Sequence, residues 1–384
     1  MLITRKSRSL NVLFAAVVLL GVMFTSSTTW AQSNITPISS RSISSAEAGQ
    51  VAAYWTNERM LNAKPLQMMT PPKAVATPSP TFGPPEGPVV LADSGNPSDI
   101  PKEQRFASTA GIPEPTFGTY SFSYTRYRLF PDRNDLALYK TFPYRTVGKL
   151  YFTIPGEGNF VCSASVVNSD NKSVVWTAGH CVYSPGIGFH TNFLFSPGRF
   201  LTANPFGTWT AFQAFTLGGW TNGLLEYDHG AFVMNRGGLG GASLIGDVVG
   251  WLGFAANWPR EQHWHASGYP SAPRDLSLTP PGAQFDGLHH EICAATWASN
   301  DQPTGLPGLD PPTIGIGCDQ TGGSSGGPWI IDFSGFGGAN NFLNGNNSYK
   351  YTGPNPPENL KMWGPYFSNG AISLRDAAKI VIVP

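Results

Sequence analysis

The chain has 384 residues, more than most single domains, which predicts one folded domain with additional segments or two domains. Only 12% of the residues are charged and the formal net charge is zero, so no nucleic-acid partner and no acidic tail for a cationic partner are expected. Glycine (44) and proline (34) make up about a fifth of the chain, which favours short strands joined by turns.

The first 31 residues have the three parts of a secretory signal peptide. Basic residues at positions 5, 6 and 8 precede an apolar run over residues 12–24, and a small-residue cleavage site follows at residues 29–31. The apolar run is too short for a comfortable membrane span. We therefore expect a secreted protein without stable membrane association after signal removal; an uncleaved N-terminal anchor is the alternative.

Residues 32–140 are interrupted by many prolines and are expected to be largely non-globular. A chain with so many prolines is expected to be extended and exposed to solvent, and to bury little apolar surface. Only residues 45–61 have a spacing of apolar side chains that suits a short amphipathic helix. A removable propeptide and an attached linker or tail both fit this composition.

From residue 141 to residue 384, short segments rich in β-branched and aromatic residues alternate with turns. Such a pattern predicts an all-β sandwich or barrel. One late segment, residues 373–381, has a helical pattern with Ser373 as its N-cap. The expected strands include residues 147–154, 160–167, 173–177, 231–234 and 329–331.

Three motifs in this region carry the residue types of nucleophilic catalysis. Residues 177–181 read Thr-Ala-Gly-His-Cys, residues 227–233 place an Asp before an apolar strand, and residues 322–328 read Gly-Gly-Ser-Ser-Gly-Gly-Pro. A serine hydroxyl is a weak nucleophile until a neutral imidazole takes its proton, and the imidazole in turn needs an orienting carboxylate.

We assign His180 as the general base, Asp228 as the orienting carboxylate and Ser325 as the nucleophile. An Asp before a strand is often only a capping residue, so Asp247 is kept as the alternative carboxylate. Ser324 is the alternative nucleophile because it is adjacent in the same turn.

The nucleophile turn also matches G-x-S-x-G, the elbow of the α/β-hydrolases. That fold needs its acid and then its His after the serine, but no His follows His290 in this chain. The order His, Asp, Ser therefore excludes a lipase or esterase of that fold.

The three motifs, in this order, resemble those of the trypsin/chymotrypsin superfamily of serine proteases, in particular its secreted bacterial and fungal branch that includes the glutamyl endopeptidases. The resemblance runs from about residue 142 to the C-terminus. It implies two antiparallel Greek-key β-barrels, over about residues 141–240 and 241–384, with the site between them and a C-terminal helix outside. It also implies an oxyanion hole formed by the backbone N–H groups of Gly323 and Ser325.

Four cysteines allow three pairings in an exported chain. Cys162 with Cys181 and Cys293 with Cys318 are each close in sequence and adjoin one motif, so local pairing is the economical expectation. The resemblance supports the first pair and leaves the second open.

No cofactor and no metal are predicted. The cysteines lack the C-x-x-C spacing of zinc sites. His263 and His265 would share one face of a strand, but two histidines without a third ligand are a weak metal signal.

The resemblance places the expected substrate pocket at Asp319, Gln320 and Asn346. Asp319 lies six residues before Ser325, where trypsin-like enzymes carry the carboxylate at the base of the pocket. A carboxylate there would favour Arg or Lys before the cut by charge pairing, unless it only hydrogen-bonds loop amides. Glutamyl endopeptidases instead use a His from a strand after the nucleophile, which this chain lacks.

The sequence therefore predicts a secreted, monomeric serine endopeptidase that cleaves proteins or peptides through an acyl-enzyme. The alternative is a catalytically silent relative that serves as a binding or adhesion module. Trypsin has an Asp just before its nucleophile that pairs with the newly cut N-terminal amine, whereas this chain has Ser324. Removal of a propeptide would therefore have to act by steric release or through another contact.

Overall fold

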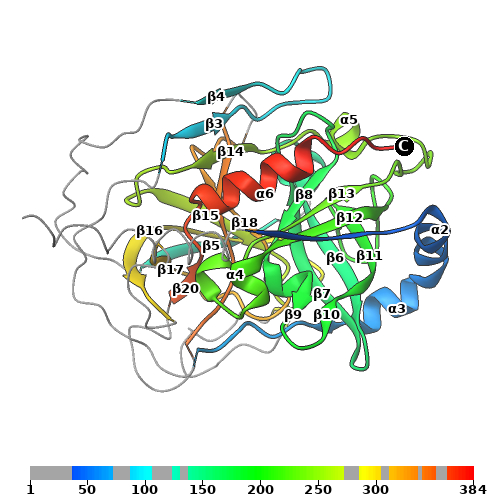
Figure 1. Cartoon of the computed structure of the whole chain (residues 1–384), viewed down its shortest axis with the longest axis horizontal. Coiled ribbons are helices and arrows are strands. Elements are labelled where there is room, and N and C mark those ends of the chain that lie inside the picture. The colour runs from blue at the N-terminus through cyan, green and yellow to red at the C-terminus, as the bar shows by residue number, and fades with distance from the viewer. Residues whose placement is uncertain are drawn as a thin grey trace, which may run out of the picture.

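The computed structural model describes residues 37–71, 87–105, 123–129, 137–271, 285–303, 311–335, 340–351 and 361–384. The predicted signal peptide lies outside these residues. Two β-sheets lie side by side, and helix α6 (Asn369–Lys379) contacts strands of both (Figure 1). Over the described ranges, no helix has the length and apolar character needed to span a bilayer.

Six antiparallel strands form a closed barrel. They pair in the order β12-β11-β6-β7-β8-β13, and β13 returns to β12. Large apolar side chains such as Phe152, Phe195 and Trp209 fill the interior. The strands are β6 (Val147–Ile154), β7 (Gly158–Val166), β8 (Val174–Thr177), β11 (Thr191–Pro197), β12 (Trp209–Leu217) and β13 (Gly230–Met234), with a small hairpin of β9 (Tyr183–Ser184) and β10 (Gly188–Phe189) beside them.

The second sheet has the order β20-β17-β16-β15-β18-β19-β14-β3-β4, and β5 pairs with β16. Here β3 is Val90–Ala92, β4 is Glu103–Arg105 and β5 is Tyr124–Arg128. The predicted all-β fold is confirmed. The second sheet includes one parallel pairing, β14 with β19, and differs from the first in having no closing pairing among the described strands. Its later strands are β14 (Gly253–Ala256), β15 (His263–Gly268), β16 (Glu291–Asp301), β17 (Thr313–Gly317), β18 (Pro328–Ile331), β19 (Phe342–Asn346) and β20 (Lys361–Gly364).

The described parts of residues 32–140 are folded against both sheets, unlike the largely non-globular segment that the prolines suggested. Strand β1 (Ile38–Ser42) pairs with β12 and β2 (Lys64–Pro65) pairs in parallel with β7. Strands β3 (Val90–Ala92), β4 (Glu103–Arg105) and β5 (Tyr124–Arg128) extend the second sheet. Most of these short strands take their backbone hydrogen bonds from strands of the main sheets rather than from one another, so prolines between them are tolerated.

The amphipathic pattern over residues 45–61 corresponds to two helices, α2 (Ser45–Tyr54) and α3 (Asn57–Asn62). The side chains of Ser44 and Thr56 cap them by accepting hydrogen bonds from backbone N–H groups three residues ahead.

The buried side chains of these helices and their junction pack on the first barrel. Val51, Trp55 and Met60 form one apolar cluster with barrel residues Tyr151, Val161 and Leu194. The Trp55 indole also donates to the carbonyl of Asn192 at 2.6 Å. We call Val51, Trp55 and Met60 the anchor.

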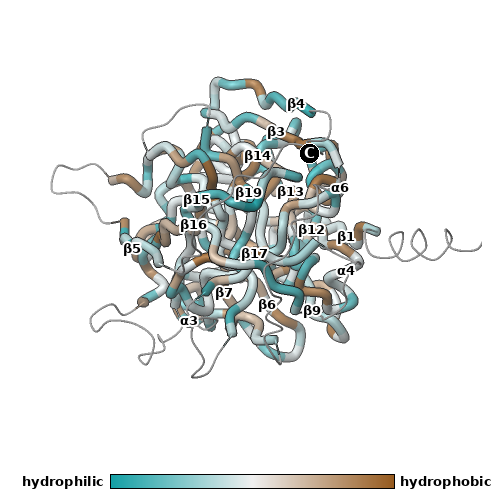
Figure 2. Tube along the Cα trace, turned by 90° about the vertical axis from the view of Figure 1, so that its left-hand side faces the viewer, coloured by the Kyte–Doolittle hydropathy of each residue, from teal (hydrophilic) through white to brown (hydrophobic). Residues whose placement is uncertain are grey.

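Helix α6 begins four residues earlier than predicted. Its N-cap is Ser368, whose hydroxyl accepts from the N–H of Gly370, whereas Ser373 lies inside the helix. Hydrophobic and hydrophilic residues are interspersed along the chain (Figure 2), although most strands of the two sheets are buried on both faces.

Candidate active site

His180 lies on a single 3-10 turn, η3 (Gly179–Cys181), that follows β8. Two features fix this turn. The disulfide Cys162–Cys181 ties it to β7, and a Cβ atom on Gly179 would lie 2.7 Å from the Trp220 ring, so only glycine fits. The imidazole is consequently held in a buried position, with 4% of its side chain exposed.

Asp228 follows another 3-10 turn, η4 (Leu225–Tyr227), and is fully buried. One carboxylate oxygen is 2.7 Å from His180 Nδ1, and the other accepts from the His180 backbone N–H at 2.7 Å. The Ser348 hydroxyl donates to the first oxygen at 2.5 Å. Since an ionised carboxylate only accepts, Nδ1 donates the proton in this contact.

Burial of Asp228 acts to raise the pKa of its carboxyl, but His180 and the Ser348 hydroxyl outweigh this effect and hold the pKa below its usual value. The carboxylate is thus ionised at neutral pH. Ser348 has no counterpart in the sequence predictions, because a lone serine after two asparagines carries no recognisable signal. The alternative carboxylate, Asp247, pairs with Lys172 at 3.0 Å and is 44% exposed.

Ser325 lies in the glycine-rich turn that precedes β18. Gly326 has a φ of +77°, and a Cβ atom on it would lie 2.0 Å from Thr177 Oγ1, so the turn adjoins the end of β8 from which the His180 turn starts. The Ser325 carbonyl accepts from the N–H of Ser163 at 2.8 Å on β7. The first barrel therefore holds both turns.

The two candidate nucleophiles differ in their hydrogen bonding. The Ser324 hydroxyl donates to the Thr321 carbonyl at 2.8 Å. Ser325 Oγ is buried and has no hydrogen-bond partner, and the same is true of His180 Nε2. The serine-to-imidazole hydrogen bond is therefore not formed in this state, although both groups have their bonding capacity free.

Of the two expected oxyanion donors, the N–H of Gly323 is engaged. It donates to the carbonyl of Leu66, just after β2, at 3.0 Å. The Gly323 carbonyl in turn accepts from Ser163 Oγ at 3.0 Å. Both backbone groups of Gly323 are thus bonded, and its N–H points at residue 66 in the N-terminal part of the chain.

The three residues expected in the substrate pocket are bonded to protein groups. Asp319 pairs with Arg126 of β5 at 3.1 Å, and its side chain is 7% exposed. The Gln320 amide donates to two backbone carbonyls. The Asn346 amide is fully buried, donates to the backbone carbonyl of Asp228 and accepts from the Trp176 indole.

Both predicted disulfides are present, the second joining Cys293 of β16 to Cys318 after β17. In the described chain, two groups of residues have ligand atoms close enough for a metal, but each includes a disulfide pair, whose sulfurs are not free thiolates. His263 and His265 do share one face of β15, with ring centroids 5.1 Å apart.

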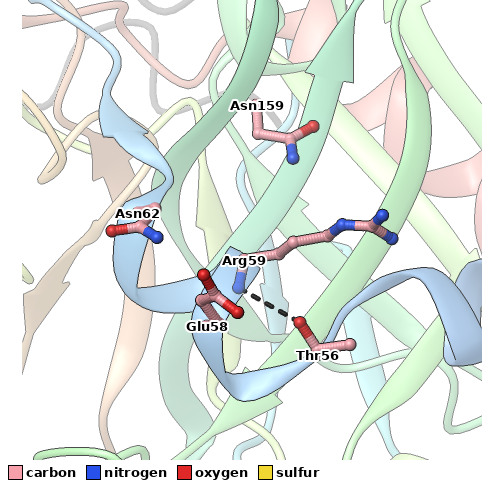
Figure 3. A pocket seen from close by; sticks show the side chains of 5 residues that line it. All are labelled: Thr56, Glu58, Arg59, Asn62 and Asn159. Atoms are coloured by element: carbon pink, nitrogen blue, oxygen red, sulfur yellow. Dashed lines mark hydrogen bonds between the residues drawn. The ribbon is translucent and has the colours of Figure 1, made fainter.

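A surface pocket lies away from these residues, between α3 and β7 (Figure 3). Its lining is polar, and none of the predicted catalytic residues contributes to it. The lining residues are Thr56, Glu58, Arg59, Asn62 and Asn159.

Two solved structures resemble this chain over nearly their whole length. Protease Anisep from Arthrobacter nicotinovorans is 35% identical, with 62% of this chain and 96% of that chain covered and a TM-score of 0.51. The thermostable serine protease AL20 from an extremophilic microorganism is also 35% identical, with 62% and 98% covered and a TM-score of 0.51.

Two characterised relatives match a shorter stretch. An extracellular metalloprotease of Bacillus subtilis is 31% identical over 125 residues, and a glutamyl endopeptidase of Bacillus licheniformis is 29% identical over 125 residues. These stretches cover 32% of this chain and 37% and 35% of the relatives, so the match spans about a third of each relative. No family model matches the chain.

The all-β fold, together with the similarity to a named serine protease over nearly all of that protein's length, defines the class. The chain belongs to the trypsin/chymotrypsin-like serine proteases.

Proposed function

We propose that this protein is a secreted serine endopeptidase in which His180, Asp228 and Ser325 form the catalytic triad. The observation that carries the proposal is the buried Asp228 carboxylate, which is bonded to His180 Nδ1 while Nε2 stays unpaired. The adjoining glycine-rich turn holds Ser325, whose hydroxyl is also unpaired.

In the proposed reaction, Ser325 Oγ attacks the peptide carbonyl as its proton moves to His180 Nε2. The N–H groups of Gly323 and Ser325 stabilise the oxyanion that forms. His180 then gives the proton to the leaving amine as the C–N bond breaks, which leaves an acyl-serine. A water molecule, deprotonated by His180, releases the acid and regenerates the hydroxyl.

Secretion is proposed from the signal-peptide pattern of residues 1–31. Two disulfides fit an oxidising compartment, and one relative is named an extracellular metalloprotease. Protein or peptide substrates follow from the protease family.

We also propose a preference for Arg or Lys before the cut, through Asp319. The pairing of Asp319 with Arg126 limits this preference, because a basic substrate side chain would have to compete with the guanidinium. A relative named a glutamyl endopeptidase makes cutting after acidic residues the opposing outcome.

Cleavage of an unbiased peptide library by secreted protein of determined N-terminus tests the proposal. We expect cutting that Ser325→Ala abolishes and that Ser324→Ala, the matched control in the same turn, retains. Cleavage after Arg or Lys supports the role of Asp319, and cleavage after other residues removes it. Folded, processed protein that cuts nothing and does not react with a fluorophosphonate would instead be a silent binding module.

A further inference from the structure

The chain that follows helix α3 (Figure 1) pairs with the first barrel through β2 and then reaches Tyr349, beyond β19 of the second sheet. We call residues 64–69 the strap. On the barrel side, Leu66 N–H donates to the Val161 carbonyl of β7 at 3.1 Å. On the other side, Met69 forms a bridge with Tyr349, and its carbonyl accepts from Lys350 N–H at 3.0 Å.

Between these two attachments the strap touches the nucleophile turn directly. The Leu66 carbonyl takes the N–H of Gly323 at 3.0 Å. A Cβ atom on Gly322 would lie 2.8 Å from the same carbonyl oxygen and 3.1 Å from Gln67 Cα. The Leu66 carbonyl thus accepts the hydrogen bond that the Gly323 N–H would give to the oxyanion in the proposed mechanism. The strap also leaves no room for a side chain at position 322.

The reacting atoms are also closed to solvent. Ser325 is fully buried, His180 is 4% exposed, and Ser325 Oγ and His180 Nε2 are buried without hydrogen-bond partners. Leaving a buried polar group unpaired is costly, and among the unpaired buried groups of the described residues are the two that a substrate has to reach. The contacts of Leu66 and Gln67 with this turn supply a cover.

We infer that the strap is an autoinhibitory segment, which occupies the substrate site in the intact chain and must leave it before peptides can bind. This inference rests on the proposed function of Ser325 and His180. The inhibiting segment is a defined part of the same chain. Its release would activate the protein without the ion pair to a new N-terminal amine, which cannot form because Ser324 replaces the Asp of trypsin.

The strap is held by more than its own few hydrogen bonds. The anchor ends at Met60, four residues before the strap, and its Trp55 ring lies 5.3 Å from the Tyr151 ring of the barrel. A peptide cut after the strap would leave the anchor in place. Release therefore requires loosening the anchor, and this makes Trp55 the residue to change.

The first experiment measures the rate at which a fluorophosphonate labels Ser325 in the full secreted chain. We expect slow labelling in the wild type and faster labelling in Trp55→Ala, by up to about a hundredfold, the usual effect of one oxyanion donor. Trp258→Ala, which removes a partly buried indole of the second sheet's core, is the matched control and should leave the rate unchanged.

A reversible lock provides the second arm. Lys64 and Phe160 are register partners on β2 and β7, at a spacing that a disulfide can bridge. Adding Lys64→Cys and Phe160→Cys to Trp55→Ala should return labelling to the slow rate, and mild reductant should restore the fast rate. The native disulfides are buried, and Trp55→Ala alone with reductant controls for them.

The outcomes separate the two proposals. If the locked chain labels as fast as Trp55→Ala, the strap does not inhibit and the inference is overturned, while the proposed function stands. In a Ser325→Ala background, formation of the lock disulfide reports the position of the strap without any activity. A lock that forms while no variant is labelled overturns the proposed function and with it the inhibitory role.

Discussion

At the residue scale, the most exacting contact in the site is that of Asp228 with His180 Nδ1. Asp228→Asn keeps the shape of the side chain, but its amide can favour the wrong imidazole tautomer. We expect kcat of the activated protein to fall about 10⁴-fold with little change in thermal stability. The measurement is steady-state hydrolysis of the best library peptide, with the melting temperature taken in parallel.

Asp247→Asn is the matched control, since Asp247 is the exposed carboxylate that sequence alone left as an alternative. A large loss of activity in Asp247→Asn, or none in Asp228→Asn, would refute the assignment. The triad candidates could be predicted because each belongs to a local motif. Ser348 and the bonding of Gln320 and Asn346 could not, since they depend on which carbonyls and carboxylates the fold brings within reach.

At the element scale, helix α6 begins at Asn369, whereas the sequence pattern predicted Ser373 as the N-cap. Ser368 is extended and its hydroxyl accepts from Gly370 N–H, whereas Ser373 is inside the helix. We expect Ser368→Ala to lower the free energy of unfolding by about 1 kcal/mol. Ser373→Ala should change it by only a few tenths, because alanine is the better helix former. Urea titration of both variants measures the difference, and equal effects would contradict the observed cap.

The N-terminal strands show why elements can escape prediction. Strands β1 to β5 have only two to five residues each, too few to show a period of their own. Most of them pair with strands far along the chain, as β1 does with β12 and β5 with β16. Their structure is determined by the pairing positions that the main sheets offer. The barrel strands, in contrast, are runs rich in β-branched and aromatic residues, and this composition reveals them.

At the scale of the whole molecule, the fold buries three imidazoles besides that of His180. Burial lowers the pKa of His190 to about 4, that of His229 to about 4 and that of His290 to about 3. Each ring lies against aromatic neighbours, such as Phe152 for His190 and Tyr269 for His290. In the unfolded chain the same groups titrate near the ordinary histidine value of about 6.5.

Between about pH 4 and 6.5, the unfolded chain therefore binds protons that the folded protein does not. Because stability rises with pH wherever the unfolded state binds more protons, acid should lower the free energy of unfolding across this window. Each group contributes at most about 1.4 kcal/mol per pH unit. Above about pH 7 these three groups are neutral in both states and contribute no slope.

Replacing His290 by Phe tests whether buried imidazoles cause this loss of stability in acid. His290 has two unpaired buried nitrogens, and its pKa is lowered the most of the three. We expect His290→Phe to flatten the dependence of unfolding free energy on pH between about 3 and 6.5, because it removes one proton from the difference between the states. His263→Phe, at an exposed position, is the control. Denaturant titrations at a series of pH values give the slopes, and an unchanged slope in His290→Phe would show that this imidazole charges without unfolding.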